Sequence, residues 1–470
     1  MVHLPILRWG CPYRSLDVQP IADVITGEPI ATISTANPGL VQRDLLGARV
    51  AADALRRMPV DALVDALERA ADLYRSATLP LGDESLSIDQ FVHVQAATSG
   101  IPESFCRGHV DTIAWTLQHT RDLLDALGPT DPRPLASAAS SIAAATITYQ
   151  PQADAVGVVL PSNSPGVHTL WLPLLPLRFP VVLKPGSNEP WTPYRLAAAL
   201  RASGIPHEAI AIYPGHAPVA SAIVDGCGRA VVFGGADTAA RFDRDPRIQM
   251  HGPGFSKIVF GDDEVDRWEA YLDVLVESIV ANAGRSCTNC SSIWASRHTT
   301  AMADALAARL ADVPALPPAD PSARLAALPV GGAATAISAA IDADLAASGA
   351  VDVTARRRRD RRATVGRAEY LLPTIVHCDG PESPLARREY MFPFAAVVRC
   401  GQERVAEAIG PTLVCTAITA DPALRRALAE HRGIDRLNLG PIPTTAINRL
   451  QPHQGNLVDF LFRPMAVQLA

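Results

Sequence analysis

The chain arranges its apolar residues in two different ways. From residue 40 to about 128 they recur at every third or fourth position, most clearly over residues 60–77, which is the spacing of one buried helix face. From about residue 153 onward, short apolar runs alternate with helix-prone stretches. We therefore predict a helical first region, followed by a region in which strands and helices alternate.

The predicted strands are short and apolar. They cover residues 156–160, 180–184, 209–213, 230–233, 258–260 and 292–294. A helix-prone stretch ends at Gly204, a residue suited to a helix stop, and further helices are predicted at 266–281 and 298–311. The proline- and alanine-rich segment 312–330 predicts loops. Strand–helix–strand units at this spacing indicate an α/β fold with a parallel, Rossmann-type sheet, the usual nucleotide-binding architecture.

Residues 136–152 differ from their surroundings. Small side chains are followed there by the β-prone run Ala-Thr-Ile-Thr-Tyr, so this segment predicts an extended arm rather than a core helix.

Composition narrows the class of protein. A chain of 470 residues predicts two or three domains, and 48% hydrophobic with 19% charged residues is typical of a globular protein. A net charge of -6 argues against nucleic acid as the main ligand. The start resembles no signal peptide, and prolines interrupt the apolar stretch 167–183, so we expect a cytoplasmic protein that does not span a membrane.

The cysteines do not suggest a disulfide framework or a metal site. Eight of them are scattered through the chain, and the single pair Cys287-Thr-Asn-Cys290 lacks the second half of a zinc site. No metal is predicted. Cys290 could instead form a reversible disulfide with Cys287, or it could be a small buried side chain.

Cys287 is the leading candidate for chemistry. It follows a Gly-Arg-Ser turn and precedes the apolar run 293–295, so its thiol is predicted at the end of an element, where backbone amides can lower the pKa of a cysteine. A thiolate in such a position can act as a catalytic nucleophile.

Five segments in order, Cys287 among them, resemble motifs of the aldehyde dehydrogenase superfamily over about residues 40–470. They are Pro161-Ser-Asn163-Ser-Pro165, Lys184-Pro185 with Thr192-Pro193, Phe233-Gly-Gly235-Ala236-Asp237, Gly284-Arg-Ser-Cys287 and Glu389-Tyr-Met-Phe-Pro393. The resemblance implies a Rossmann-type cofactor domain, an α/β catalytic domain, a β-arm for oligomerisation, and NAD or NADP as cofactor.

The resemblance also implies roles for single residues. Cys287 would attack a carbonyl carbon, and the side-chain amide of Asn163 with the backbone amide of Cys287 would stabilise the oxyanion. Asn163 could also cap the helix that follows it. On the cofactor, Lys184 would bind the adenosine ribose and Glu389 the nicotinamide-side ribose. The small residues Gly215, Gly235 and Ala236 would let the backbone approach it closely.

Ser187 and Glu189 bear on the choice of cofactor. Ser187 stands near the place where NAD-preferring members often carry a glutamate, and a serine would leave room for the 2′-phosphate of NADP. Because Glu189 lies two residues further on, both NAD and NADP remain open.

The segment Met250-His251-Gly252-Pro253-Gly254 departs from the superfamily, because His251 stands where many members have a general-base glutamate. Three readings follow. His251 could be the base that activates water; the missing carboxylate could indicate transfer of the acyl group to coenzyme A; or the imidazole could only hydrogen-bond backbone.

The resemblance predicts an organisation in domains and an assembly. Residues 1–135 and 153–250 would form the NAD(P)-binding domain, 251–447 the catalytic domain, and 136–152 with 448–470 the oligomerisation arm. Residues 462–469 could form a strand that pairs with a neighbour's arm, in a homodimer or homotetramer. The segment 451–456 departs from the superfamily pattern, so the substrate class cannot be carried over.

Three functions therefore stand as alternatives. The first is oxidation of a small-molecule aldehyde through a thioester on Cys287. The second is the CoA-acylating form of this chemistry, which includes reduction of an acyl thioester. The third is a non-catalytic nucleotide-binding relative, against which the joint presence of Cys287, Asn163, Lys184 and Glu389 argues.

Overall fold

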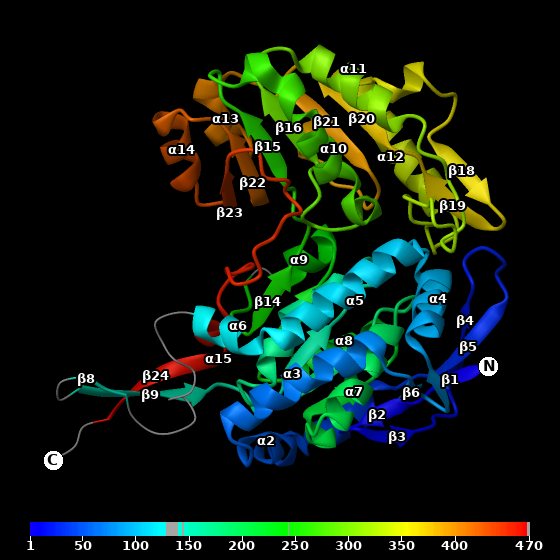
Figure 1. The fold of residues 1–470 in the computed structure, drawn as a ribbon, viewed down its shortest axis with the longest axis vertical. Helices are drawn as coiled ribbons and strands as arrows, with labels where there is room; N and C mark the ends of the chain where they lie inside the picture. Colours follow the sequence, from blue (N-terminus) through cyan, green and yellow to red (C-terminus); the bar gives the residue numbers. More distant parts are fainter. Residues whose placement is uncertain (128–139, 143–144, 243, 468–470) are drawn as a thin grey trace.

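A computed structural model describes residues 1–127, 140–142, 145–242 and 244–467. Two seven-stranded sheets, each accompanied by helices, form the two halves of the molecule, and a thin three-stranded arm projects from one half (Figure 1). The α/β fold class predicted from the sequence is confirmed.

The first sheet has the strand order β14-β13-β10-β11-β12-β2-β3. Its strands are β2 (Ile6–Arg8), β3 (Cys11–Tyr13), β10 (Val156–Val159), β11 (Val181–Lys184), β12 (Ile210–Ile212), β13 (Arg229–Phe233) and β14 (Ile248–His251). The strands β10 to β14 are parallel, whereas β2 and β3 add antiparallel strands at one edge. The four strands expected between residues 156 and 233 are thus confirmed. They are apolar throughout because helices bury both faces of a parallel sheet.

The second sheet has the order β17-β20-β21-β16-β15-β22-β23. Its strands are β15 (Lys257–Phe260), β16 (Ser292–Ala295), β17 (Val351–Asp352), β20 (Thr374–Cys378), β21 (Phe394–Arg399), β22 (Thr412–Ile418) and β23 (Ile434–Leu439). All neighbours are parallel except β17 with β20. Since β14 belongs to the first sheet and β15 to the second, the chain crosses between them at residues 252–256.

Helices fill the stretches where helical spacing was predicted. Their bounds are α1 (Pro38–Leu45), α2 (Ala48–Arg56), α3 (Val60–Ser76), α4 (Ile88–Ser99), α5 (Glu103–Gln118), α6 (Thr120–Ala126), α7 (Trp191–Ala202), α8 (Ala217–Gly226), α9 (Ala236–Phe242), α10 (Leu272–Val280), α11 (Thr299–Leu310), α12 (Ala333–Ser348), α13 (Gln402–Ala408), α14 (Pro422–Ala429) and α15 (Leu457–Leu461). The predicted helix 266–281 begins with a 3-10 segment, Val265–Tyr271, before α10.

Two features were not anticipated. The helical first region is interrupted by a hairpin of β6 (Leu79–Leu81) and β7 (Glu84–Leu86), whose turn contains Gly82 at a left-handed φ of 70°. Short strands also form from β1 (Val2–Leu4), β4 (Val18–Ala22) and β5 (Pro29–Ser34), and from β18 (Arg362–Val365) and β19 (Ala368–Leu371). Each has three to six residues, too few for a clear period.

The arm consists of β8 (Ser140–Ile142), β9 (Ala145–Pro151) and β24 (Phe462–Val467), in the order β24-β9-β8. A strand forms at residues 462–467 of the predicted 462–469 and pairs with β9 of its own chain, whereas pairing with a neighbour's arm stays a prediction. Residues 136–139, 143–144 and 468–470 lie outside the described residues.

We predict that Arg195→Met lowers the stability of the first half. Arg195 is fully buried on α7, and its guanidinium donates to the carbonyl oxygens of Tyr74 at 2.9 Å and Ala77 at 2.7 Å at the end of α3. Methionine would leave both carbonyls without a donor, so the free energy of unfolding should fall by about 2–4 kcal/mol in urea denaturation. Arg201→Met, an exposed site on the same helix, is the control and should change it by less than about 0.5 kcal/mol. Equal effects of the two substitutions would contradict the prediction.

Candidate active site

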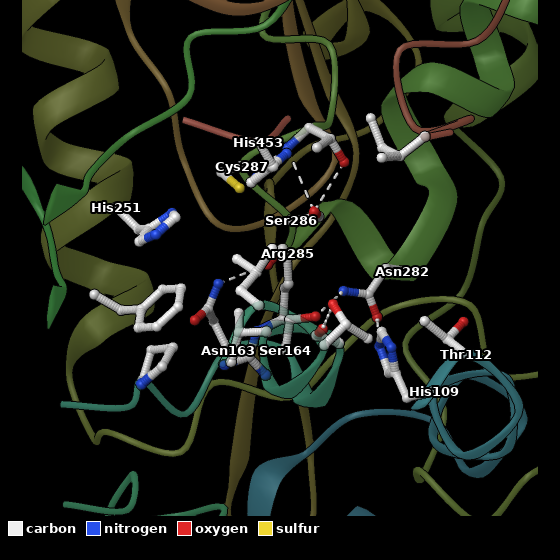
Figure 2. Close-up of a pocket in the computed structure, with 18 of the residues that line it drawn as sticks. His109, Thr112, Asn163, Ser164, His251, Asn282, Arg285, Ser286, Cys287 and His453 are labelled. Atoms are coloured by element: carbon white, nitrogen blue, oxygen red, sulfur yellow. Dashed lines mark hydrogen bonds between the residues drawn. The ribbon is translucent and has the colours of Figure 1, made fainter. Parts of the chain in front are cut away.

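A cavity of about 910 Å³ is lined by residues from both halves of the molecule. The lining includes the ends of β13 and β14, parts of α5 and α6, the loop before β16, and the segment 445–457. Cys287, Asn163 and His251 all line it (Figure 2). The structure therefore brings together the three residues predicted to carry the chemistry.

The loop that carries Cys287 leaves α10 through a strained turn. Asn282, Ala283 and Gly284 have left-handed φ values of 51°, 55° and 69°, a conformation that alanine rarely adopts. Asn289 then fixes the loop, because its Oδ1 accepts from the backbone N–H of Ser286 at 2.8 Å. Backbone strain of this kind persists where the surrounding structure enforces it, often at functional sites.

The crossing between the two sheets holds Cys287 from the other side. Gly254 lies so close that a Cβ atom there would overlap the carbonyl oxygen of Cys287, and the hydroxyl of Ser256 donates to that oxygen at 2.9 Å. Only glycine fits at residue 254, so the contact with the nucleophile loop accounts for the second glycine of the Gly-Pro-Gly sequence.

The pKa of the Cys287 thiol is raised to about 12 rather than lowered. Burial is the main cause and the carboxylate of Glu389 adds to it, whereas the hydroxyl of Ser286 and the backbone amides of Cys287 and Thr288 act in the opposite direction. The expectation of a lowered pKa was wrong for this form of the protein, because a low-polarity surrounding disfavours the thiolate more than the amides favour it.

Asn163 points its amide at the nucleophile loop. Its Nδ2 donates to the carbonyl oxygen of Arg285 at 2.8 Å and lies 3.7 Å from Sδ of Met391. A thioether is a weak acceptor, so the second N–H can turn to a stronger one. The capping role is not seen, since Ser164 precedes the following 3-10 helix and no side chain caps it.

The side chain of Arg285 has a separate role. Its Nη1 donates to the carbonyl oxygens of Ser99 at 3.0 Å and Ala327 at 3.5 Å. Ser99 is the last residue of α4, where a cation interacts favourably with the helix dipole. Arg285 therefore joins the nucleophile loop to the helical layer of the other half.

His251 ends β14 and is buried. Its ring stacks on Phe233 with 4.7 Å between centroids, and Nδ1 lies 2.6 Å from Oε1 of Gln454. Because an amide oxygen only accepts, Nδ1 carries the proton and Nε2 is left as an acceptor. Burial lowers the pKa of His251 to about 4, so the ring is neutral at neutral pH. Its partner is a side chain, which does not match the reading in which it only bonds backbone.

The sequence analysis missed Gln454 and His453, which come from the segment that departs from the superfamily pattern. The ring of His453 lies parallel to that of His251, with 6.1 Å between centroids. The guanidinium of Arg436 holds the segment by donating to the carbonyl oxygens of Pro452 at 2.6 Å and Asn448 at 3.0 Å. Gln454 and His453, which lie in the segment that departs from the superfamily pattern, therefore form part of the surroundings of His251.

Glu389 is bound to the crossing rather than to the cavity lining. Its Oε2 accepts from the backbone N–H of Phe255 at 2.5 Å, while its buried Oε1 has no partner among the described residues. Phe255 has a left-handed φ of 46°, and Nζ of Lys257 donates to its carbonyl oxygen at 2.6 Å. Burial raises the pKa of Glu389 to about 7, and Lys257, like Gln454 and His453, was not predicted from the sequence.

The other predicted cofactor residues differ in where they lie relative to the cavity. Ser187 and Gly235 line the cavity, and a Cβ atom on Gly235 would meet open space. Lys184 ends β11 and Ala236 begins α9, both at the carboxyl edge of the first sheet, where α/β folds bind ligands. Gly215 faces Val219 of α8 instead, and the structure does not place it on the cavity.

Glu189 is buried and does not line the cavity. Its Oε1 accepts from the amide of Gln95 at 3.0 Å and from the hydroxyl of Thr192 at 2.7 Å. With a relative exposure of 2%, this carboxylate is committed to the packing of α4 against α7. The glutamate that could have contacted a ribose hydroxyl is therefore not available, and Ser187 is the polar residue on the cavity.

Within the described ranges, no group of three potential metal ligands occurs and no helix is long and apolar enough to cross a membrane. Cys290 is buried, and its thiol donates to the carbonyl oxygen of Ser292 at 3.2 Å. This arrangement agrees with the interpretation of Cys290 as a small buried side chain.

Comparison with known proteins assigns the family. Residues 14–410 match the aldehyde dehydrogenase family. The chain belongs to the aldehyde dehydrogenase family. Among curated relatives, the Mycobacterium bovis protein named "Putative succinate-semialdehyde dehydrogenase (NADP(+)) 2" is 28% identical over 291 residues, which cover 60% of this chain and 52% of the relative. The match thus spans about half the length of that relative.

Solved structures show that the whole chain has the aldehyde dehydrogenase fold. KauB from Pseudomonas aeruginosa superposes with a TM-score of 0.83 at 18% identity, covering 100% of this chain and 97% of that one. AldA of P. syringae, an indole-3-acetaldehyde dehydrogenase described in complex with NAD+ and IAA, gives a TM-score of 0.82 at 18% identity with the same coverage. At this identity the likeness shows the fold alone.

We predict that Cys287 of this family member reacts slowly with iodoacetamide at pH 7 in the absence of cofactor. With a pKa raised to about 12, the thiolate fraction, and hence the rate, should rise about tenfold per pH unit between pH 7 and 10. Glu389→Gln should speed the reaction by removing a nearby negative charge. Mass spectrometry of the Cys287 peptide measures the rate, with Cys287→Ser as the blank. A rate that is already constant above pH 7 would contradict the raised pKa.

Proposed function

We propose that the protein oxidises an aldehyde to a carboxylic acid through a thioester on Cys287, with NAD or NADP as acceptor. The observation that carries the proposal is the convergence of Cys287, Asn163 and His251 on one cavity. Membership of the aldehyde dehydrogenase family supports it. The cofactors named for the relatives, NADP in the name of the mycobacterial protein and NAD+ in the P. syringae structure, agree with it.

In the first step, the thiolate of Cys287 attacks the carbonyl carbon, a C–S bond forms, and the carbonyl electron pair moves to oxygen. The backbone N–H of Cys287 and the second N–H of Asn163 would stabilise the oxyanion, each contributing about 3 kcal/mol to lowering the barrier. NAD or NADP, when bound, supplies the acceptor for the hydride whose loss leaves a thioester on Cys287. Formation of the thiolate needs a lower thiol pKa than the cofactor-free protein has.

The residues at the cofactor side fit a dinucleotide. The buried Oε1 of Glu389 has no hydrogen-bond donor among the described residues, and a ribose hydroxyl would supply one. Lys184 ends β11 at the carboxyl edge of the sheet, and Gly235 leaves open space for a ligand beside the backbone. Because Glu189 is buried and Ser187 is uncharged, no carboxylate here repels the 2′-phosphate of NADP, so both cofactors fit.

In the last step, water would attack the thioester carbonyl carbon while His251 accepts its proton at Nε2 and Gln454 holds Nδ1–H. The C–S bond would then break, which releases the carboxylic acid and returns the sulfur of Cys287 as the leaving group. The ring is neutral at neutral pH and ready to act, but a base with a pKa of about 4 is weak. A second candidate function follows from this weakness, namely transfer of the acyl group to coenzyme A. A thiol with a pKa of about 8.5 needs less help from a base than water does.

We also propose a homodimer or homotetramer formed through the arm. In the order β24-β9-β8 both outer strands have an unpaired edge among the described residues, and such edges can pair with another chain. The domain boundaries at residues 135, 153, 250 and 447, and the cytoplasmic location, stay predictions from the sequence.

The first test measures NAD+ and NADP+ reduction with a panel of aldehydes, with and without coenzyme A. CoA-independent formation of free acid, abolished in Cys287→Ser, is expected for hydrolysis, whereas CoA-dependent acyl-CoA formation would establish the second candidate. Consumption of NADH or NADPH with acyl-CoAs tests the reverse reaction. No turnover in any assay would contradict both and favour the non-catalytic nucleotide-binding alternative.

We predict that hydrolysis of the thioester does not slow between pH 7 and 5. The active form of His251 is the neutral ring, which persists down to a pKa of about 4, whereas an ordinary histidine would lose activity below about 6.5. His251→Ala should lower the steady-state rate by about a hundredfold while preserving the first-turnover burst of reduced cofactor. Stopped-flow absorbance measures both, and loss of the burst would contradict the assignment.

A further inference from the structure

We propose that the side of the cavity opposite His251 binds a hydroxyl group on the carbon chain of the aldehyde. Figure 2 shows His251 and His109 at opposite sides, with Cys287 and Asn163 between them. This inference rests on the proposed aldehyde oxidation and specifies the class of substrate.

One face of α5 supplies a polar wall. His109, Thr112 and Thr116 follow each other at spacings of three and four residues, which places them on the same side of the helix, and all three line the cavity. The hydroxyl of Thr112 accepts from Nη2 of Arg449 at 3.2 Å and keeps its own hydrogen for a ligand. A helix face buried only for packing would carry apolar residues at these positions.

A chain of hydrogen bonds continues this wall toward the nucleophile. Nε2 of His109 lies 2.7 Å from Oδ1 of Asn282, and Nδ2 of Asn282 donates to the hydroxyl of Ser164 at 3.2 Å. Ser164 directly follows Asn163. The second amide hydrogen of Asn282 and the hydroxyl hydrogen of Ser164 take no part in this chain, so each can be donated to a substrate oxygen.

The backbone is distorted at Asn282, where the side chain enters the cavity. Asn282 and Ala283 both have left-handed φ values, 51° and 55°, a backbone conformation that residues other than glycine adopt at a cost in free energy. Asn282 also bridges His109 on α5 and Ser164, so the position of this one amide depends on two other elements. Strain that serves to place a polar side chain in a cavity indicates a binding function.

The charges on this side favour an uncharged substituent. Glu277 and Arg449, one of each sign, line the cavity, and their formal charges cancel. Burial lowers the pKa of His109, which keeps its ring neutral, and Arg285 is committed to backbone carbonyls. A hydroxyl can accept from Asn282 and donate to another oxygen. A carboxylate would compete for Arg449, whose guanidinium already donates to Thr112 and lies over the ring of Trp115, and it would enter a cavity that also carries the like charge of Glu277.

The expected consequence is discrimination against plain alkyl aldehydes. An alkyl chain would leave the second amide hydrogen of Asn282 and the hydroxyl hydrogens of Ser164 and Thr112 without an acceptor in the cavity. Sites that hydrogen-bond a substrate hydroxyl reject analogues that lack it far more strongly than an apolar pocket rejects an extra methylene.

The test compares kcat/KM for glyceraldehyde, propanal and succinate semialdehyde with the full-length enzyme and the cofactor that supports turnover. We expect glyceraldehyde to exceed propanal by about tenfold or more. A preference for succinate semialdehyde, or equal values for all three, would overturn the inference while leaving aldehyde oxidation intact. No activity with any aldehyde would instead contradict the proposed function itself.

Substitutions at the two ends of the hydrogen-bond chain show which residues recognise the hydroxyl of the substrate. His109→Phe keeps the ring but removes both nitrogens, and Ser164→Ala removes the hydroxyl at the other end of the chain; each should lower kcat/KM for glyceraldehyde about tenfold and leave that for propanal unchanged. His93→Phe, an exposed histidine of α4, is the control and should change neither. If His109→Phe fails to fold, Ser164→Ala decides alone. A parallel fall for both substrates would show a structural role and overturn the inference.

Discussion

The contact between Gly254 and the backbone of Cys287 is the constraint on which the rest of the site depends. Gly254 belongs to residues 251–257, which carry the chain from the end of β14 to the start of β15. His251 opens this passage, Gly254 packs on the nucleophile loop, Phe255 holds Glu389, and Ser256 bonds Cys287. The candidate base, the carboxylate proposed to bind a ribose and the proposed nucleophile are therefore positioned by one short segment. A displacement there would move all of them together.

Cations paired with carbonyl oxygens hold these parts in place. Lys257 is fully buried and donates to Phe255 and Pro411, Arg285 caps α4, and Arg436 holds the segment 448–452. Backbone carbonyl oxygens do not change their protonation state, so these hydrogen bonds persist at every pH at which the cations are charged. Carboxylates in this region are thereby left free of strong partners, as Glu389 shows with its buried, unpaired Oε1.

Some of the strands and some of the reacting groups could be predicted from the sequence, and others could not. Strands β10 to β13, β15 and β16 were predictable because each is a short run with an apolar interior between helical stretches, whereas β14 and β20 to β23 were not predicted. Cys287 and Asn163 were predictable because they lie in recognisable motifs. Gln454 could not be found, since it meets His251 across about 200 residues of sequence and no local pattern marks the contact. The pKa of Cys287 was misjudged in sign because desolvation depends on how deeply the folded chain buries the thiol.

The position of Gln454 also limits how the chain can vary in length. Only residues 455–461, which include α15, separate it from β24, and β24 is fixed in register against β9 from Phe462 onward. Asn456 further ties this stretch to the end of α6 by donating to the carbonyl oxygen of Leu127. One inserted residue would either withdraw the amide from His251 or shift the strand by one position and invert its faces. We therefore expect the chain to tolerate insertions and deletions better at exposed loops that lie away from the cavity.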